Sequence, residues 1–120
     1  MEEKMKKILI IDDDPLIRKY LSNLLNDNGY ETATAENAKD ALDLVGLESF
    51  DLITLDLEMP GEWGTRFFSK LAQDKQKKNI PVIVISGMSG NQYAIPKAVA
   101  SLTKPFDQKE LLKIVRDVLQ

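Results

Sequence analysis

Three consecutive carboxylates, Asp12, Asp13 and Asp14, follow a run of aliphatic residues in the stretch "ILIIDDDP". Like charges repel, and burial at the end of a strand raises that cost, so a positive partner is expected beside them. A hard divalent cation takes oxygen ligands, and Mg2+ commonly uses one or two carboxylates together with phosphate oxygens. The stretch therefore predicts a Mg2+ site.

Polar residues also end three other apolar runs. Asp56 ends "DLITLD", Ser86 ends "IPVIVIS", and Lys104 follows the short run 101–103. Singly, each residue has an ordinary explanation as a turn residue or helix cap, and we expect Asp14 to be only a cap. Together they indicate one shared site, because solvated loop residues have no reason to choose the same edge of a sheet.

Short apolar runs alternate with helical patterns along the chain. Strands are expected at 7–11, 30–35, 51–56, 80–86 and 101–103, with the second strand weak and at an edge. Helices are expected from Pro15 toward Gly29, from Asn37 up to Gly46, around Phe67 to Leu71, and from Asp107 through Leu119, with Glu110 completing a capping box. The segment 87–99 contains two glycines and Pro96, so a fourth helix there is expected to be short or irregular.

This alternation predicts an α/β fold with a doubly wound, five-stranded parallel sheet and helices on both faces. In such sheets, ligands gather beyond the carboxyl ends of the strands, where the strand order reverses. The carboxylates, the hydroxyl and the ammonium group are therefore expected at one edge of the sheet.

Composition bounds the function. The chain has 120 residues, 43% of them hydrophobic, and we expect 1–120 to form a single domain. A net charge of −3 gives no broad basic excess, so we expect no direct nucleic-acid binding and no membrane insertion. The chain has no cysteine and no histidine, which excludes thiolate metal sites and the commonest general base. The opening "MEEKMKK" precedes only four apolar residues, so we expect a cytoplasmic protein.

The stretches "LIIDDDP", "LDLEMPGEWG", "VISG" and "TKPF" together resemble the receiver domain of bacterial two-component response regulators. The resemblance covers essentially the whole chain. Its most specific element is an aspartate followed by "xxMPxxxG", which runs from Asp56 through Met59 and Pro60 to Gly64. It implies a flavodoxin-like sheet of order 2-1-3-4-5 and a phosphoprotein of phosphorelay signal transduction.

The resemblance also implies a metal site. Asp13 would bind Mg2+ directly and Asp12 partly through water, alongside the carboxylate of Asp56. The backbone carbonyl of Glu58 would supply a further ligand.

The chemistry that the resemblance implies is phosphoryl transfer onto Asp56 from a phosphohistidine of a histidine kinase or phosphotransfer protein. Ser86 would donate its hydroxyl to a phosphoryl oxygen, and Lys104 would pair with another. The Lys104–Pro105 bond resembles one that is cis in the family. Self-phosphorylation and self-dephosphorylation are expected, without turnover of a separate small molecule, and the signal would pass to an unidentified protein target.

Two departures from the family concern signal output. The family often has an aromatic residue three positions before the lysine, where this chain has Ser101. Ser86 and Lys104 are 18 positions apart, roughly one helical turn fewer than the family's usual spacing. These departures leave open a pseudo-receiver that binds partners without being phosphorylated. A phosphatase of the haloacid dehalogenase type is a second alternative, although "DLE" only approximates its motif.

Overall fold

The computed structural model describes residues 5–56, 63–87 and 98–120, with the backbone alone at 63–65. Strands and helices alternate along these ranges, as the sequence predicts. The strands are β1 (Lys7–Ile11), β2 (Glu31–Ala35), β3 (Leu52–Leu55), β4 (Val82–Ser86) and β5 (Ala100–Thr103). The helices are α1 (Pro15–Asp27), α2 (Ala38–Leu47), α3 (Trp63–Gln73) and α4 (Gln108–Leu119).

All five strands pair in parallel in one sheet of order β2-β1-β3-β4-β5, which confirms the predicted doubly wound fold. The strand order reverses between β1 and β3, because the chain continues from β1 to β2 on one side and from β2 back to β3 on the other. Every residue of β3 and β4 is buried, whereas β2 is mostly exposed or half-buried. This difference explains why β2 is the weakest strand in the sequence pattern: an edge strand needs fewer aliphatic side chains.

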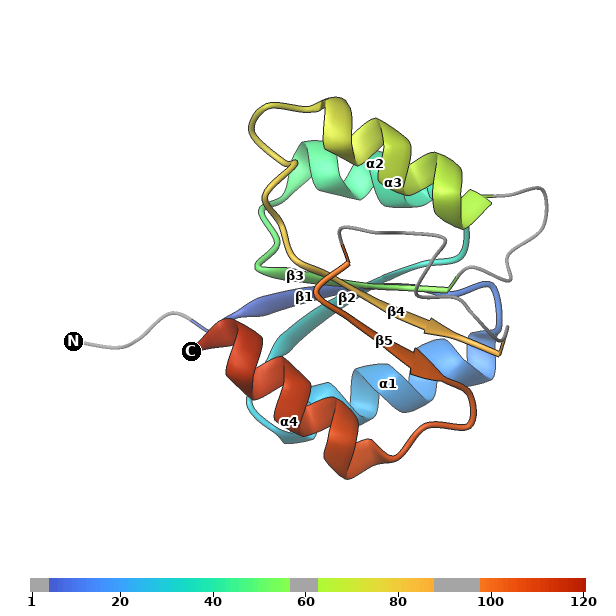
Figure 1. Cartoon of the computed structure of the whole chain (residues 1–120), viewed down its shortest axis with the longest axis vertical. Helices are drawn as coiled ribbons and strands as arrows, with labels where there is room; N and C mark the ends of the chain where they lie inside the picture. Colours follow the sequence, from blue (N-terminus) through green and yellow to red (C-terminus); the bar gives the residue numbers. More distant parts are fainter. Residues whose placement is uncertain (1–4, 57–62, 88–97) are drawn as a thin grey trace.

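Helices cover both faces of the sheet (Figure 1). α2 and α3 lie over one face, above a core that includes Leu9, Phe67 and Val84. α1 and α4 lie over the other face, above a second core that includes Ile10, Leu25 and Val115. Among the described residues, no helix is both long enough and apolar enough to cross a membrane.

Side-chain caps begin three of the helices. The carboxylate of Asp14 accepts the backbone N–H of Leu16, and the side chain of Asn37 accepts that of Asp40. Asp107 likewise accepts the N–H of Lys109. These bonds satisfy backbone donors that the first helical turn leaves without partners, and they confirm the predicted helix starts.

Three segments refine the predicted boundaries. α2 continues through Gly46 to Leu47, because the backbone N–H of Glu48 still bonds to Leu44 and closes the last turn. β5 begins at Ala100, one residue earlier than predicted. The expected short helix within 87–99 lies mostly outside the described residues.

Candidate functional site

The register between β1 and β3 brings two acids together. Ile11 pairs with Leu55, so the next residue of each strand, Asp12 and Asp56, reaches the carboxyl edge at the same level. A backbone hydrogen bond of 3.0 Å from Asp56 N to the Ile11 carbonyl extends the ladder to this point. Asp12 and Asp56 are each only 2% exposed. Two carboxylates thus lie at the top of the hydrophobic core, where ionised groups are costly unless they are paired.

Asp13 completes a cluster of three acids. One carboxylate oxygen from each of Asp12, Asp13 and Asp56 lies within 4.8 Å of the others. Asp12 and Asp56 are buried, and Asp13 is exposed. This set offers only oxygen ligands, with one side open toward water, which fits a hard divalent cation such as Mg2+ that keeps part of its hydration shell.

Lys104 places a positive charge beside the buried acids. Its Nζ atom lies 2.9 Å from Oδ2 of Asp12 and 3.6 Å from Oδ2 of Asp56. The side chain of Lys104 is 21% exposed, against 3% for each carboxylate. The lysine is held from its backbone as well, because its N–H bonds to the carbonyl of Ser86 at 2.9 Å. The peptide bond from Lys104 to Pro105 is cis, as expected.

Burial and charge act in opposite directions on Lys104. Burial alone would lower the pKa of Lys104, because it disfavours the ammonium form. The hydrogen bond and charge of Asp12, together with the charge of Asp56, outweigh burial and raise the pKa of Lys104 above its ordinary value of 10.5. Lys104 is therefore a firmly protonated cation between two buried carboxylates.

Every polar group of Asp12 has a partner. Its N–H bonds to the Ala35 carbonyl, and its Oδ1 accepts the N–H of Asp14 at 2.9 Å. Its Oδ2 accepts a hydrogen bond from Lys104. Nη1 of Arg18 donates to its carbonyl oxygen at 2.7 Å. These bonds fix both the backbone and the carboxylate, so Asp12 is a rigid member of the cluster.

Arg18 is a residue that the sequence reasoning missed. It is the fourth residue of α1, at the end of the first turn, and its guanidinium group reaches back to the end of β1. A basic residue about one helical turn past an acidic strand end is the available signal, because helical geometry returns its side chain to that end. Arg18 is a positioning residue for the acids.

Ser86 ends β4 with 0% exposure, and its residue pair across the sheet is Thr103, next to Lys104. The structure thus brings together the side chains of Asp12, Asp13, Asp56 and Lys104, and it places Ser86 beside Lys104 through the β4–β5 ladder. Glu58, predicted as a carbonyl ligand, lies outside the described residues.

Known proteins share this sequence and architecture. The chain is 35% identical over 109 residues to the protein Rrf1 of Nitratidesulfovibrio vulgaris, which covers 91% of this chain and 79% of Rrf1. It is 32% identical to the transcriptional regulatory protein GlrR of Escherichia coli, but spans only 28% of that protein.

Solved structures agree with this similarity. Chemotaxis protein CheY4 of Vibrio cholerae superposes with a TM-score of 0.90 at 32% identity, over 97% of this chain and 100% of that one. The response regulator protein TrrA of Thermotoga maritima, solved in complex with Mg2+-BeF, superposes with a TM-score of 0.85 at 35% identity, over 96% of this chain and 100% of that one. The sequence pattern of the response regulator receiver domain matches residues 8–116. The chain therefore belongs to the response regulator receiver domain family.

Proposed function

We propose that this chain is a receiver domain that accepts a phosphoryl group on Asp56 from a phosphohistidine of a histidine kinase or a phosphotransfer protein, and signals through protein–protein contacts in the cytoplasm. The observation that carries the proposal is the cluster of Asp12, Asp13 and Asp56, with carboxylate oxygens within 4.8 Å of one another. We further propose that 1–120 act as one such domain.

The acids fit Mg2+ by number, ligand type and access to water. Asp13 is the exposed member and would contact the ion directly, and the buried Asp12 would contribute directly or through water. Bound Mg2+ would offset the negative charge that accumulates between the Asp56 carboxylate and the incoming phosphoryl group. The Mg2+-BeF complex of TrrA, which shares 35% identity with this chain, supports the same assignment here.

In the proposed step, a carboxylate oxygen of Asp56 attacks the phosphorus atom. The P–O bond of an acyl phosphate forms as the P–N bond to the partner's imidazole breaks, and the imidazole nitrogen keeps the electron pair of that bond. The lack of histidine in this chain fits the scheme, because the donor imidazole belongs to the partner. Asp56 needs no general base, because its carboxylate is already the nucleophile.

Lys104 would change partners during this step. It lies between Asp12 and Asp56, at 2.9 and 3.6 Å from their Oδ2 atoms. Attack converts the carboxylate of Asp56 into an ester-like oxygen with less charge, while the phosphoryl oxygens bring new negative charge. The flexible ammonium group can then turn toward a phosphoryl oxygen without leaving the site. Ser86 would donate its hydroxyl to another phosphoryl oxygen.

Acetyl phosphate and Mg2+ test this proposal, with the intact protein weighed afterwards. We expect the mass of one added phosphoryl group, removed by alkali and absent in EDTA or in Asp56→Asn. Asp51→Asn is the matched control, because Asp51 lies at the other edge of the sheet, where its carboxylate accepts the N–H of Lys7. An alkali-stable adduct on Ser86, or no adduct at any Mg2+ concentration, would contradict the proposal and favour the pseudo-receiver alternative.

A further inference from the structure

Positive charge is concentrated after α3. The stretch from Lys70 to Lys78 contains four lysines and one acid, a net charge of +3, in a chain whose net charge is −3. The rest of the chain therefore carries −6. Such separation of charge produces a local positive potential on an otherwise acidic molecule.

Three of these lysines have no acidic partner among the described residues. Lys75, Lys77 and Lys78 form no ion pair with any carboxylate of the described residues. The single acid, Asp74, uses its Oδ1 to accept the N–H of Gln76 at 2.8 Å, so its carboxylate serves the turn itself. The ammonium groups remain available to an external partner.

A hollow lined by both apolar and polar side chains lies directly beside the lysines. Its volume is about 230 Å³, and its lining consists of Phe68, Leu71, Ala72, Lys78, Asn79 and Ile80. Phe68 and Ile80 are only partly buried against the core under α3, so they present apolar surface to the hollow. Pockets for small molecules typically measure about 300 to 1,000 Å³, so this hollow is of a size for one side chain.

The rim of the hollow is a hydrogen-bonded turn. The N–H groups of Lys77 and Lys78 both bond to the carbonyl of Asp74, at 3.1 and 2.8 Å, and the N–H of Ile80 bonds to the carbonyl of Lys77 at 3.1 Å. A rim that is already ordered loses little conformational entropy when a partner binds. The hollow and the lysines at its rim thus form a surface that is already ordered before a partner binds.

We propose that this basic hollow, defined as Phe68, Leu71, Ala72, Ile80 and the lysines of 75–78, binds an acidic peptide segment of a partner protein and takes one of its apolar side chains. Charge complementarity with the lysines would steer and orient the peptide, and the hollow would fix its register.

Two other classes of partner fit less well. A nucleic-acid backbone offers phosphates but no apolar side chain, so it would leave the hollow unused. A lipid surface needs a broad exposed apolar face to insert, whereas the apolar surface here is confined to a hollow of about 230 Å³. An acidic peptide with one apolar side chain would contact both the lysines and the hollow.

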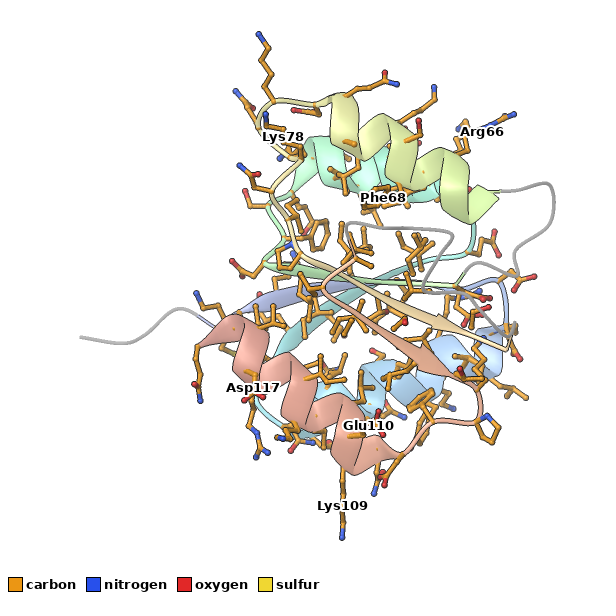
Figure 2. All side chains as sticks on the ribbon, in the orientation of Figure 1. Arg66, Phe68, Lys78, Lys109, Glu110 and Asp117 are labelled. Carbon is orange, nitrogen blue, oxygen red and sulfur yellow. The ribbon has the colours of Figure 1, made fainter. Side chains whose placement is uncertain are left out.

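The basic hollow is separate from the acid site. It lies where the chain leaves α3 and enters β4, at the amino edge of the sheet, whereas the acids lie at the carboxyl edge. Lys78 lies in the turn between α3 and β4, and Lys109 projects away from the sheet from α4, which covers the opposite face (Figure 2). The proposal uses no residue of the acid site and stands independently of phosphorylation.

Fluorescence anisotropy with labelled acidic peptides tests the proposal. Each probe has eight Asp and Glu residues around one central residue, which is Leu, Phe, Met or Ser. We expect at least one apolar-centred probe to bind several-fold more tightly than the Ser-centred probe. Lys78→Glu should weaken that binding about fivefold or more, because a reversed charge at the rim repels the peptide. Ala72→Trp, which fills the hollow, should remove the advantage of the apolar centre.

Lys109→Glu is the matched control, because it makes the same charge change on an exposed part of α4, and it should bind the probe like the parent. Amide chemical shifts on binding should change most at Phe68, Leu71, Ala72 and 78–80. Equal binding of apolar and Ser-centred probes, or equal weakening by Lys78→Glu and Lys109→Glu, would overturn the proposal. Tighter, Lys78-dependent binding of single-stranded DNA or of anionic phosphatidylserine vesicles would overturn it as well.

Discussion

The two edges of the sheet carry charge in opposite ways. At the carboxyl edge, Asp12 and Asp56 are 2% exposed and share the ammonium group of Lys104. At the amino edge, Lys7 pairs with Glu48 and lies 5.6 Å from the ring centroid of Phe50, with both charged side chains partly exposed. The acids are thus buried at one edge and partly hydrated at the other, whereas the two lysines are similarly exposed, at 21% and 26%.

This difference separates chemistry from surface recognition. Buried charges interact strongly because little water screens them, but they cost stability unless each has a partner. Hydrated charges interact weakly and cost almost nothing. The carboxyl edge therefore suits the nucleophile and the metal ion that we propose, whereas substitutions of charged residues at the amino edge should cost little stability.

Removal of one lysine from each edge gives the largest contrast. Lys104→Met leaves two buried carboxylates without their cation, so we expect a loss of about 2 to 3 kcal/mol in the free energy of unfolding, as for a lost hydrogen bond between charged groups. Lys7→Met removes a partly exposed ion pair and should cost about 0.5 to 1 kcal/mol. Urea denaturation in EDTA measures both values. Equal losses would show that the two edges do not differ in this way.

Alkaline pH should remove part of the same stabilisation. The pKa of Lys104 is raised above 10.5 on folding, so its contribution is fully present below pH 10.5 and is lost as pH rises through the raised value. The parent protein should therefore lose stability at high pH faster than Lys104→Met, which has no ammonium group to titrate there. Urea denaturation at several pH values between about 9 and 12 tests this, and parallel curves for the two proteins would refute it.

Sequence patterns predicted the site better at the strand ends than along the helices. Asp12, Asp56 and Ser86 follow buried aliphatic runs, and parallel pairing leaves such residues no other edge to occupy. The sequence does not predict the ion pairs of Lys104, because either a metal ion or a lysine can supply the positive charge that clustered acids need.

The helices hold the features that the sequence reasoning misses. Arg18 is missed because its bond to the Asp12 carbonyl depends on the angle at which α1 leaves β1, which apolar spacing does not encode. Gly46 was misassigned as a helix end, because the bond from Glu48 to Leu44 outweighs its low helical propensity.

Arg18→Met tests whether the support of Asp12 from α1 matters for metal binding. Two effects oppose each other: the variant loses the 2.7 Å bond to the Asp12 carbonyl, and it also removes a positive charge that repels Mg2+. We expect the lost bond to dominate and to weaken Mg2+ binding about threefold to fivefold, because a hydrogen bond contributes about 1 kcal/mol and solvent screens the charge.

Isothermal titration calorimetry measures that affinity, and two variants separate the effects. Arg18→Gln keeps a donor without the charge and should bind Mg2+ at least as tightly as Arg18→Met. Lys19→Met removes a neighbouring cation that has no bond to Asp12 and should leave the affinity close to that of the parent. Equal weakening by Lys19→Met and Arg18→Met would show that the lost bond to Asp12 is not the cause, and tighter Mg2+ binding by Arg18→Met would show that the removed charge dominates.

Neutralisation of one acid at each edge should give the smallest difference between the edges in free energy of unfolding. It tests directly whether the clustered acids repel one another. Asp13 is exposed, yet its carboxylate lies within 4.8 Å of those of Asp12 and Asp56. In EDTA, Asp13→Asn should raise the free energy of unfolding by about 0.5 kcal/mol, because it relieves repulsion between partly hydrated like charges. Asp51→Asn should give no such gain, because Asp51 accepts the N–H of Lys7 at 2.9 Å and lies outside the cluster. With saturating Mg2+, the parent should become more stable than Asp13→Asn. The parent gains stability by binding the ion, whereas Asp13→Asn lacks the exposed ligand and gains little. Thermal melting with and without Mg2+ shows both effects. If Asp13→Asn melts below the parent in EDTA, or gains as much stability from Mg2+ as the parent does, the metal site is misassigned.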